Sequence, residues 1–337
     1  MRLLLGALAG QNFSAELTGD ASLRARPMGR VTGPLSQLGA RFDGDSQTAP
    51  IHIRGGRLSN TTITSTVASA QVKTAVLLAG LQAEGTLSFS EPALSRDHTE
   101  RMLGAMGVVF DRTIDADGVH TIRLQGPQTP RAVDVEVPGD ISSATFFLVA
   151  ATIVEGSDIT IEHVGVNPSR TGALDVLLRM GADITLQNER EVGGEPVADI
   201  RVRSSSLEPV RIHGPLIPRL VDEIPVLSVA MAHADGTSRI EDAGELRVKE
   251  SDRIATTMGI LNSLNVEAQE QSDGLTISGG SERSMTPPQI DAGLDHRIAM
   301  AALVAGLPLN GETSVGGADS INSSFPNFLD LVEQLRA

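Results

Sequence analysis

The chain has 337 residues, a formal net charge of -15 at neutral pH and no cysteine. A surface this acidic repels nucleic acid and anionic membranes, so we expect neither as a partner. The lack of cysteine excludes disulfides, thiolate metal sites and a cysteine nucleophile, and no apolar run reaches the ~18–20 residues of a membrane span.

Five apolar stretches rich in small residues recur along the chain, and each predicts a helix that runs into a glycine. A strand-like stretch follows, as in residues 157–164. The glycines recur every 71 to 80 residues, a period too long for the common solenoid repeats. The apolar stretches cover residues 1–10, 69–85, 142–156, 221–236 and 294–311, and their glycines are Gly10, Gly85, Gly156, Gly236 and Gly311.

A second helix is predicted later in each copy, and another strand-like stretch follows it, as in residues 198–204. These elements predict five copies of a β-α-β-α-β-β-like unit and therefore an α/β (α+β) fold. The polar stretch 125–140 is the best domain boundary, which predicts a first domain at 1–137 with two copies and a second at 138–337 with three. The second helices are predicted at residues 34–42, 100–110, 173–184, 255–268 and 328–337.

The opening stretch "MRLLLGALAG" has two interpretations. As a secretory signal it has a single positive charge and an apolar region near the ~7-residue minimum, interrupted by Gly6. As the first helix of a copy it aligns with the four later helices, and we favour this interpretation. It predicts that a sixth copy once preceded this one and that Met1 is an internal methionine.

Helix starts in the first two copies carry residues suited to binding an anion. Arg26 precedes a proline in a predicted turn, and Arg96 comes just before a helix start. Ser69 and Gln71 lie at another helix start, where free backbone N–H groups favour anions. Taken singly, each is more simply explained as a surface turn, a serine N-cap or a solvated first turn carrying Asp97 and Glu100.

Helix starts in the later copies carry both carboxylates and cations, at residues 222–223, 245–253 and 295–297. Singly, these are typical of N-caps and solvated charged faces. If two repeat-built domains face each other, however, the helix starts line a cleft in which cations bind phosphates or carboxylates and carboxylates transfer protons. Neither His98 nor His296 has the spacing of a metal ligand, so we expect no metal.

The stretches "LTGDASLRARPMGRV", "SAQVKTAVLLAGL", "SRDHTERML", "LRVKESDR" and "DHRIAMA", in this order, closely resemble the 3-phosphoshikimate 1-carboxyvinyltransferase (EPSP synthase) family, in its bacterial class II form. The resemblance covers essentially the whole chain. It implies a two-domain inside-out α/β barrel with three copies in each domain and the active site between them, so that five of the six copies are present here and the N-terminal region is absent.

The resemblance implies transfer of the enolpyruvyl group from phosphoenolpyruvate to the 5-hydroxyl of shikimate 3-phosphate. Three arginines would bind phosphoenolpyruvate, and the start of the helix at 69–85 would hold shikimate 3-phosphate, with a further phosphate contact from the residue before the next helix. Lys249 would bind shikimate hydroxyls, and Arg2 would end a substrate loop. The implied substrate-binding residues are Arg2, Arg26, Ser69, Ala70, Gln71, Arg96, Lys249, Arg253 and Arg297, of which Arg26, Arg253 and Arg297 are the three arginines.

Two carboxylates with opposite proton roles are implied for the chemistry. Asp222 would bind a shikimate hydroxyl and act as the base toward the 5-hydroxyl, and Glu250 would give and take the proton at the methylene carbon of phosphoenolpyruvate. His296 would support Glu250. The hydroxyl adds to C2 while C3 is protonated, and the tetrahedral intermediate then loses phosphate. The resemblance implies no metal or organic cofactor, a monomer and a cytoplasmic location.

Two alternatives stay open. The related family that acts on UDP-N-acetylglucosamine usually works with a cysteine, which this chain lacks. The chain could also be a fragment that is inactive alone. Two positions depart from the enteric form of the family: Glu245 stands where that form has a ring-binding asparagine, and Ser323 stands where it has a phosphate-binding lysine. The first departure leaves one substrate contact open.

Overall fold

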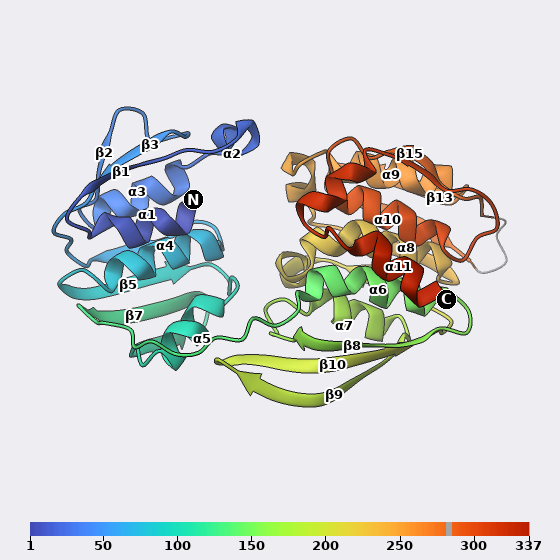
Figure 1. The fold of residues 1–337 in the computed structure, drawn as a ribbon, viewed down its shortest axis with the longest axis horizontal. Coiled ribbons are helices and arrows are strands. Elements are labelled where there is room, and N and C mark those ends of the chain that lie inside the picture. The colour runs from blue at the N-terminus through green and yellow to red at the C-terminus, as the bar shows by residue number, and fades with distance from the viewer. Residues whose placement is uncertain (281–284, 337) are drawn as a thin grey trace. The chain divides into compact units, whose positions relative to one another are not determined.

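The computed structural model describes residues 1–280 and 285–336 and confirms the predicted α/β fold (Figure 1). The chain packs as two compact units, each with its own apolar core. Unit 1 contains Met1–Glu136 and the short segment Gly193–Glu195. Unit 2 contains Val137–Val192 and Pro196–Ala337. In the described part of the chain, no helix is both long and apolar enough to cross a bilayer.

Unit 1 is built from two successive copies of helices and strands. The first has a three-stranded antiparallel sheet in the order β1-β3-β2, and the second has a four-stranded sheet in the order β4-β5-β7-β6. The first copy contains α1 (Arg2–Ala9), β1 (Ser14–Leu17), α2 (Ala21–Ala25), α3 (Gly29–Gln37), β2 (Arg41–Asp43) and β3 (Ile51–Arg54). The second contains β4 (Thr62–Thr64), α4 (Ala70–Gly80), β5 (Gly85–Glu91), α5 (His98–Ala105), β6 (Phe110–Ile114) and β7 (His120–Gly126).

Helices α1 and α4 pack against each other at the centre of unit 1 (Figure 1). They approach closely because Gly6 has no side chain: a Cβ atom at this position would lie 2.0 Å from the carbonyl oxygen of Ala75. That oxygen belongs to the backbone of α4, so it cannot rotate away as a flexible side chain could. The close approach also brings Arg2, at the start of α1, near the start of α4.

Replacing Gly6 with alanine is expected to destabilise unit 1 by about 1–3 kcal/mol, since the two helices must move apart to admit the methyl group. The matched control is Gly104→Ala in α5, because Gly104 is exposed and a Cβ there would meet only the Phe110 ring, at an ordinary contact distance of 3.9 Å. The control should be neutral or stabilising by up to about 1 kcal/mol. Urea denaturation of the two variants makes the comparison, and equal midpoints would contradict this account of the helix contact.

Unit 2 contains three further groups of elements. Its sheets have the strand orders β8-β10-β9, β11-β12-β14-β13 and β15-β16. The first group contains α6 (Ile141–Ile153), β8 (Asp158–Gly165), α7 (Gly172–Arg179), β9 (Asp183–Val192) and β10 (Glu195–Arg203). The second contains β11 (Arg211–Ile212), η1 (Gly214–Arg219), η2 (Val221–Glu223), α8 (Ile224–His233), β12 (Gly236–Ile240), η3 (Gly244–Val248), α9 (Arg253–Ser263), β13 (Glu267–Gln271) and β14 (Gly274–Gly279). The third contains β15 (Gln289–Asp291), α10 (His296–Gly306), β16 (Ser314–Gly316), η4 (Ala318–Ser323) and α11 (Phe328–Arg336).

The repetition seen in the sequence reappears in the strand pairing. In both four-stranded sheets the first two strands are parallel and the last two pair antiparallel, with the same order. The recurring glycines lie between the end of the apolar helix and the next strand, and Gly85 and Gly236 are the first residues of that strand. Four of the five have a positive φ, between 80° and 136°, which residues with a side chain rarely adopt: Gly85, Gly156, Gly236 and Gly311.

The core of unit 2 is formed by α6, α8 and α10, which pack on one another. Helices α6 and α8 are apolar around almost their whole circumference, as fits helices enclosed by other elements. Four phenylalanines join α6 to the segment that leads into α11, with ring centroids 5.4–6.1 Å apart. They are Phe146, Phe147, Phe325 and Phe328.

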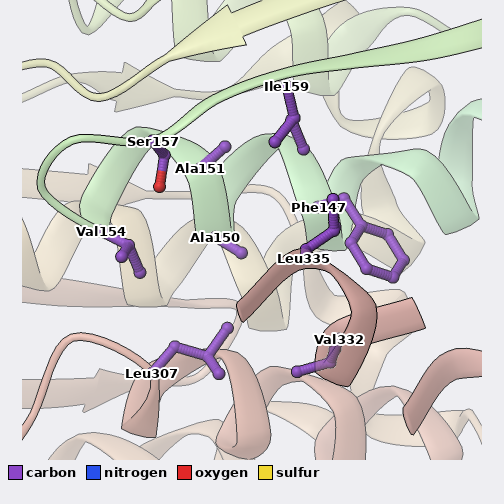
Figure 2. A pocket seen from close by; sticks show the side chains of 9 residues that line it. All are labelled: Phe147, Ala150, Ala151, Val154, Ser157, Ile159, Leu307, Val332 and Leu335. Carbon is purple, nitrogen blue, oxygen red and sulfur yellow. The ribbon is translucent and has the colours of Figure 1, made fainter. Parts of the chain in front are cut away.

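A cavity of about 100 Å³ lies beside this aromatic cluster, between α6 and α11 (Figure 2). Its lining is apolar except for Ser157, and it includes none of the implied site residues. An apolar cavity without charged groups does not suit an anionic ligand, whereas the polar helix starts do.

Candidate active site

In unit 1, Arg2 is nearly buried, with 9% of its surface exposed, and connects two segments. Its Nη1 donates a hydrogen bond to the side-chain oxygen of Gln71, in the first turn of α4, and its Nη2 donates to the carbonyl of Pro27 at 2.8 Å. Burial lowers the pKa of Arg2, and the nearby charges of Arg30 and Arg26 act in the same direction. Three arginines therefore create a positive region beside the start of α4.

The start of α4 carries no negative charge and no side-chain cap. Ser69 occupies the N-cap position with extended backbone, but its hydroxyl makes no capping hydrogen bond, and the first turn holds no acidic residue. Ser69 is therefore the N-cap residue by position, as the simpler interpretation expected, but its hydroxyl does not cap the helix. A helix start of this kind favours an anion, because its first N–H groups lack partners within the helix.

The segment that carries Arg96 is fixed by a buried ion pair. Lys73 of α4 lies 3.0 Å from the carboxylate of Glu91 and donates to the carbonyl of Ser95 at 3.1 Å. The same carboxylate oxygen accepts hydrogen bonds from the backbone N–H and the hydroxyl of Ser95. Lys73 and Glu91 are almost fully buried, so together they hold the residue before Arg96 from both sides.

The first turn of α5 is not solvated, contrary to the simpler expectation from the sequence. Asp97 and Glu100 are 6% and 1% exposed. Glu100 lies 2.8 Å from Lys73, and Asp97 pairs with Arg101 at 3.0 Å. Burial raises the pKa of Glu100, although the positive charge of Lys73 opposes the shift. The lysine within the apolar stretch 69–85 was the one sequence signal for this cluster.

In unit 2, the buried guanidinium of Arg253 binds three carboxylates from three separate segments. Arg253 opens α9 and is 1% exposed. Its Nε donates to Asp295 at 2.9 Å, its Nη1 donates to Asp222 at 3.1 Å and its Nη2 donates to Glu250 at 2.8 Å. The expectation of a solvated charged face at 245–253 is thus wrong for Arg253, which lies at the centre of the cluster.

Asp295 has two roles. It is the N-cap of α10, as the sequence suggested, and accepts a hydrogen bond from the backbone N–H of Arg297. It also receives the Nε of Arg253 and the hydroxyl of Ser251. Burial alone would raise the pKa of Asp295, but its bonds to Arg253 and Ser251 outweigh burial and lower it. The carboxylate is therefore held in its ionised form.

The remaining implied residues of unit 2 surround the same cluster. Lys249 lies 3.5 Å from Asp222 and 2.8 Å from Glu245, so Glu245 shares the lysine with the carboxylate assigned as a base. His296 follows Asp295 at the start of α10. Burial lowers the pKa of His296, and the positive charge of Arg297 acts in the same direction. The imidazole is therefore favoured in its neutral form.

The side chain of Arg297 contacts the backbone of Asp222. Its Nη1 donates to the Asp222 carbonyl at 3.1 Å and to the hydroxyl of Ser142 at 2.8 Å. Unit 2 thus brings together every implied residue of its own sequence around Arg253 and Asp222. Sequence reasoning did not assign a role to Ser142, to Arg170 or to Glu223 as a partner of arginine.

These residues can bind anions and transfer protons. In each unit, positive side chains gather at helix starts, and in unit 2 two carboxylates with different surroundings share one guanidinium. In the parts of the chain that the structure describes, His, Asp and Glu side chains are not grouped so as to hold a metal ion. The chemistry that this arrangement supports is general acid–base catalysis on an anionic substrate.

Comparison with known proteins gives consistent matches along the chain. The profile of the EPSP synthase (3-phosphoshikimate 1-carboxyvinyltransferase) family matches residues 1–332. The 3-phosphoshikimate 1-carboxyvinyltransferase of Desulforudis audaxviator is 52% identical over 338 residues, which cover 100% of this chain and 77% of that protein. The protein of the same name from Synechocystis sp. is 50% identical, with 99% and 74% covered.

Solved structures agree with these matches. EPSP synthase from Acinetobacter baumannii superimposes with a TM-score of 0.89 at 42% identity, covering 99% of this chain and 76% of that one. The enolpyruvyl transferase NikO from Streptomyces tendae superimposes with a TM-score of 0.74. Its sequence identity is only 20%, so this second likeness concerns the fold alone.

Proposed function

The chain belongs to the EPSP synthase (3-phosphoshikimate 1-carboxyvinyltransferase) family, and on this basis we propose how its residues carry out the reaction. The resemblance drawn from the motifs is thereby confirmed. The activity is transfer of the enolpyruvyl group of phosphoenolpyruvate to the 5-hydroxyl of shikimate 3-phosphate, with release of phosphate. The chain spans about three quarters of the length of the curated relatives it matches.

The observation that carries the assignment of roles is the pair of carboxylates on Arg253. Asp222 takes the proton of the 5-hydroxyl as it attacks C2, and Glu250 protonates C3 and later removes a proton from the same carbon. Their contacts with one guanidinium keep both carboxylates near each other and limit their repulsion. Different surroundings allow the two groups opposite proton roles, because Asp222 also faces Lys249 whereas Glu250 is more open to solvent.

The cations neutralise the substrates and the departing phosphate. Arg253 and Arg297 bind phosphoenolpyruvate in unit 2, and Lys249 binds shikimate hydroxyls. Planar guanidinium groups suit phosphate and carboxylate because each can donate two parallel hydrogen bonds. Charge that develops on the phosphate as it leaves is stabilised by groups already in place. His296, favoured as the neutral imidazole, supports Glu250, and the influence of the Glu250 charge on the pKa of His296 is consistent with this role.

Unit 1 supplies further contacts to the anions. The start of α4, with Ser69, Ala70 and Gln71, holds shikimate 3-phosphate, and its lack of acidic residues supports this role. Arg26 binds phosphoenolpyruvate, and the positive region that it forms with Arg2 supports this. Arg96 adds a phosphate contact. We also propose that residues 1–137 and 138–337 are the two domains of the enzyme, which the division of the chain after Glu136 supports.

Two broader features are proposed from the resemblance. The protein is a monomer in the cytoplasm, and it binds no nucleic acid, which the net charge of -15 supports. Static light scattering at micromolar concentration tests the first statement, because a dimer would give twice the mass calculated from the sequence.

Replacing Glu250 with glutamine is expected to lower kcat by about 10²–10⁴-fold, the usual contribution of a general acid–base group. The amide keeps the size of the side chain but cannot carry the proton. The measurement is phosphate release from phosphoenolpyruvate in the presence of shikimate 3-phosphate. Glu241→Gln is the matched control, since Glu241 pairs with Arg211 away from the cluster, and it should leave kcat unchanged.

The same assay separates the alternative functions. Phosphate release by the unaltered chain with shikimate 3-phosphate supports the proposal. Release with UDP-N-acetylglucosamine instead would assign the chain to the other acceptor, and release with neither would indicate a chain that is inactive alone. If Glu250→Gln turns over as fast as the unaltered chain, the role proposed for Glu250 is wrong.

A further inference from the structure

Glu223 is a buried carboxylate to which the proposed mechanism assigns no role. It follows Asp222 directly, ends η2 and is 1% exposed. It occupies the N-cap position of α8, yet its side chain makes no capping hydrogen bond. A buried charge is costly unless it is paired, so the partners of this carboxylate should reveal what it does.

One oxygen of Glu223 faces three other segments of unit 2. The hydroxyl of Ser142, in the first turn of α6, donates a hydrogen bond to Oε1. Nη1 of Arg297, in the first turn of α10, lies 3.5 Å from Oε1, and Nη2 of Arg170, just before α7, lies 3.7 Å from it. A single carboxylate therefore ties the starts of three helices together.

The contacts form a directed chain that ends on Arg297. The Ser142 hydroxyl donates a hydrogen bond to Glu223, so its oxygen is oriented to accept a hydrogen bond from Arg297. The second hydrogen of the same Nη1 goes to the carbonyl of Asp222. Both hydrogens of Nη1 are thereby used. Within the described residues, the side-chain hydrogen bonds and ion pairs of Arg297 involve Nη1 alone, which leaves Nε and Nη2 for an anion.

The charges of this cluster require the carboxylate. Arg170 and Arg297 are both cationic and both approach Oε1 of Glu223, and Arg170 is 8% exposed. Without the negative charge, two guanidinium groups would repel each other in a poorly solvated region. Arg297 is the more exposed of the two, so it is the one that would move.

We propose that Glu223 is a positioning residue for Arg297. Through Ser142 it fixes one side of the guanidinium, so that the other side presents Nε and Nη2 to an anionic group of the substrate. The inference rests on the proposed function, because it takes Arg297 as a ligand of phosphoenolpyruvate. It predicts that the loss of the Glu223 charge weakens binding of that substrate and leaves proton transfer nearly intact.

Steady-state kinetics of Glu223→Gln tests the proposal. KM for phosphoenolpyruvate should rise by about ten- to a hundredfold, the effect expected when a hydrogen bond to a charged group is misaligned. Neither kcat nor KM for shikimate 3-phosphate should change by more than a few fold. Ser142→Ala should show the same pattern more weakly. Its neighbour Ser143, which contacts Asp140 instead, gives the matched control Ser143→Ala, expected to behave as the unaltered chain.

The outcomes separate the inference from the proposed function. If the unaltered chain is active and Glu223→Gln retains its KM for phosphoenolpyruvate, the inference is overturned and the function stands. If the unaltered chain is inactive with both acceptors, the function fails, and a crystal structure of Glu223→Gln then decides the inference. Displacement of the Arg297 Nη1 from Ser142 and from the Asp222 carbonyl supports the inference, whereas an unchanged guanidinium contradicts it.

Discussion

Replacing Arg253 with methionine is expected to lower the free energy of unfolding by about 3–5 kcal/mol and to abolish turnover. The change leaves Asp295, whose side chain is fully buried, without its main partner. It also releases Asp222 and Glu250 from the guanidinium that holds them together. Urea denaturation followed by far-ultraviolet circular dichroism measures the effect, because the chain has no tryptophan or tyrosine to report by fluorescence.

Two companion variants identify the cause of this loss. Adding Asp295→Asn to Arg253→Met removes the unpaired charge, so the double variant should be more stable than Arg253→Met alone. Arg253→Lys keeps the positive charge but loses the planar guanidinium. Its stability should lie between that of the unaltered chain and that of Arg253→Met, and it should remain inactive. A double variant no more stable than Arg253→Met would show that the loss comes from packing and not from the buried carboxylate.

The pH dependence of the stability gives a second test of the ion pair between Arg253 and Asp295. Because the pKa of Asp295 is lowered in the folded protein, its stabilising contribution is present above the ordinary aspartate pKa of about 3.9 and is lost as the pH falls through the lower folded value. The stability difference between the unaltered chain and Arg253→Met should therefore be largest near neutral pH and should narrow below about pH 4. A difference that is constant from pH 7 to pH 3 contradicts the assignment.

Replacing Phe328 with alanine is expected to lower the free energy of unfolding of unit 2 by about 3–5 kcal/mol. Phe328 is fully buried, and its ring meets those of Phe146, Phe147 and Phe325. The truncation removes a large apolar group and leaves a void next to the cavity already present between α6 and α11. The folded fraction should keep its kcat, because the aromatic cluster contains no residue of the proposed site.

The neighbouring residue provides the control for this prediction. Leu329 lies in the same turn of α11 but is 50% exposed, so Leu329→Ala should cost only a few tenths of a kcal/mol. Thermal unfolding followed by circular dichroism compares the two variants. If both variants lower the midpoint equally, the aromatic cluster does not hold α11 in place. The contribution of α11 to the stability of unit 2 would then have to come from its exposed face.

Local periodicity in the sequence was enough to predict most of the helices. The apolar stretch at residues 69–85 is observed as α4, although the helix ends at Gly80 and Gly85 begins the next strand. The recurring glycine therefore marks the turn that follows the helix, where a positive φ is needed. A glycine in a sequence shows that the backbone bends nearby, but it does not by itself distinguish the helix end from the strand start.

The residues of the proposed site were found from motifs, whereas their partners were not. Asp295 looked like an N-cap and is one, but its bond to Arg253 joins positions 42 residues apart. Glu100 looked solvated and is buried against Lys73, which comes from another helix. Pairings of this kind depend on which helix starts meet in the folded chain, and a local pattern of charges contains no information about that.

The aromatic cluster also bears on how unit 2 is made on the ribosome. Translation delivers α6 before its partners, because Phe325 and Phe328 follow it by more than 170 residues, and its apolar surface stays uncovered until they emerge. During this interval the nascent helix exposes side chains that the finished unit buries, and such surfaces are the ones that aggregate or recruit chaperones. Slowing elongation between these two segments would lengthen that exposure, so the synthesis rate, and not only the final stability, governs the yield of folded protein.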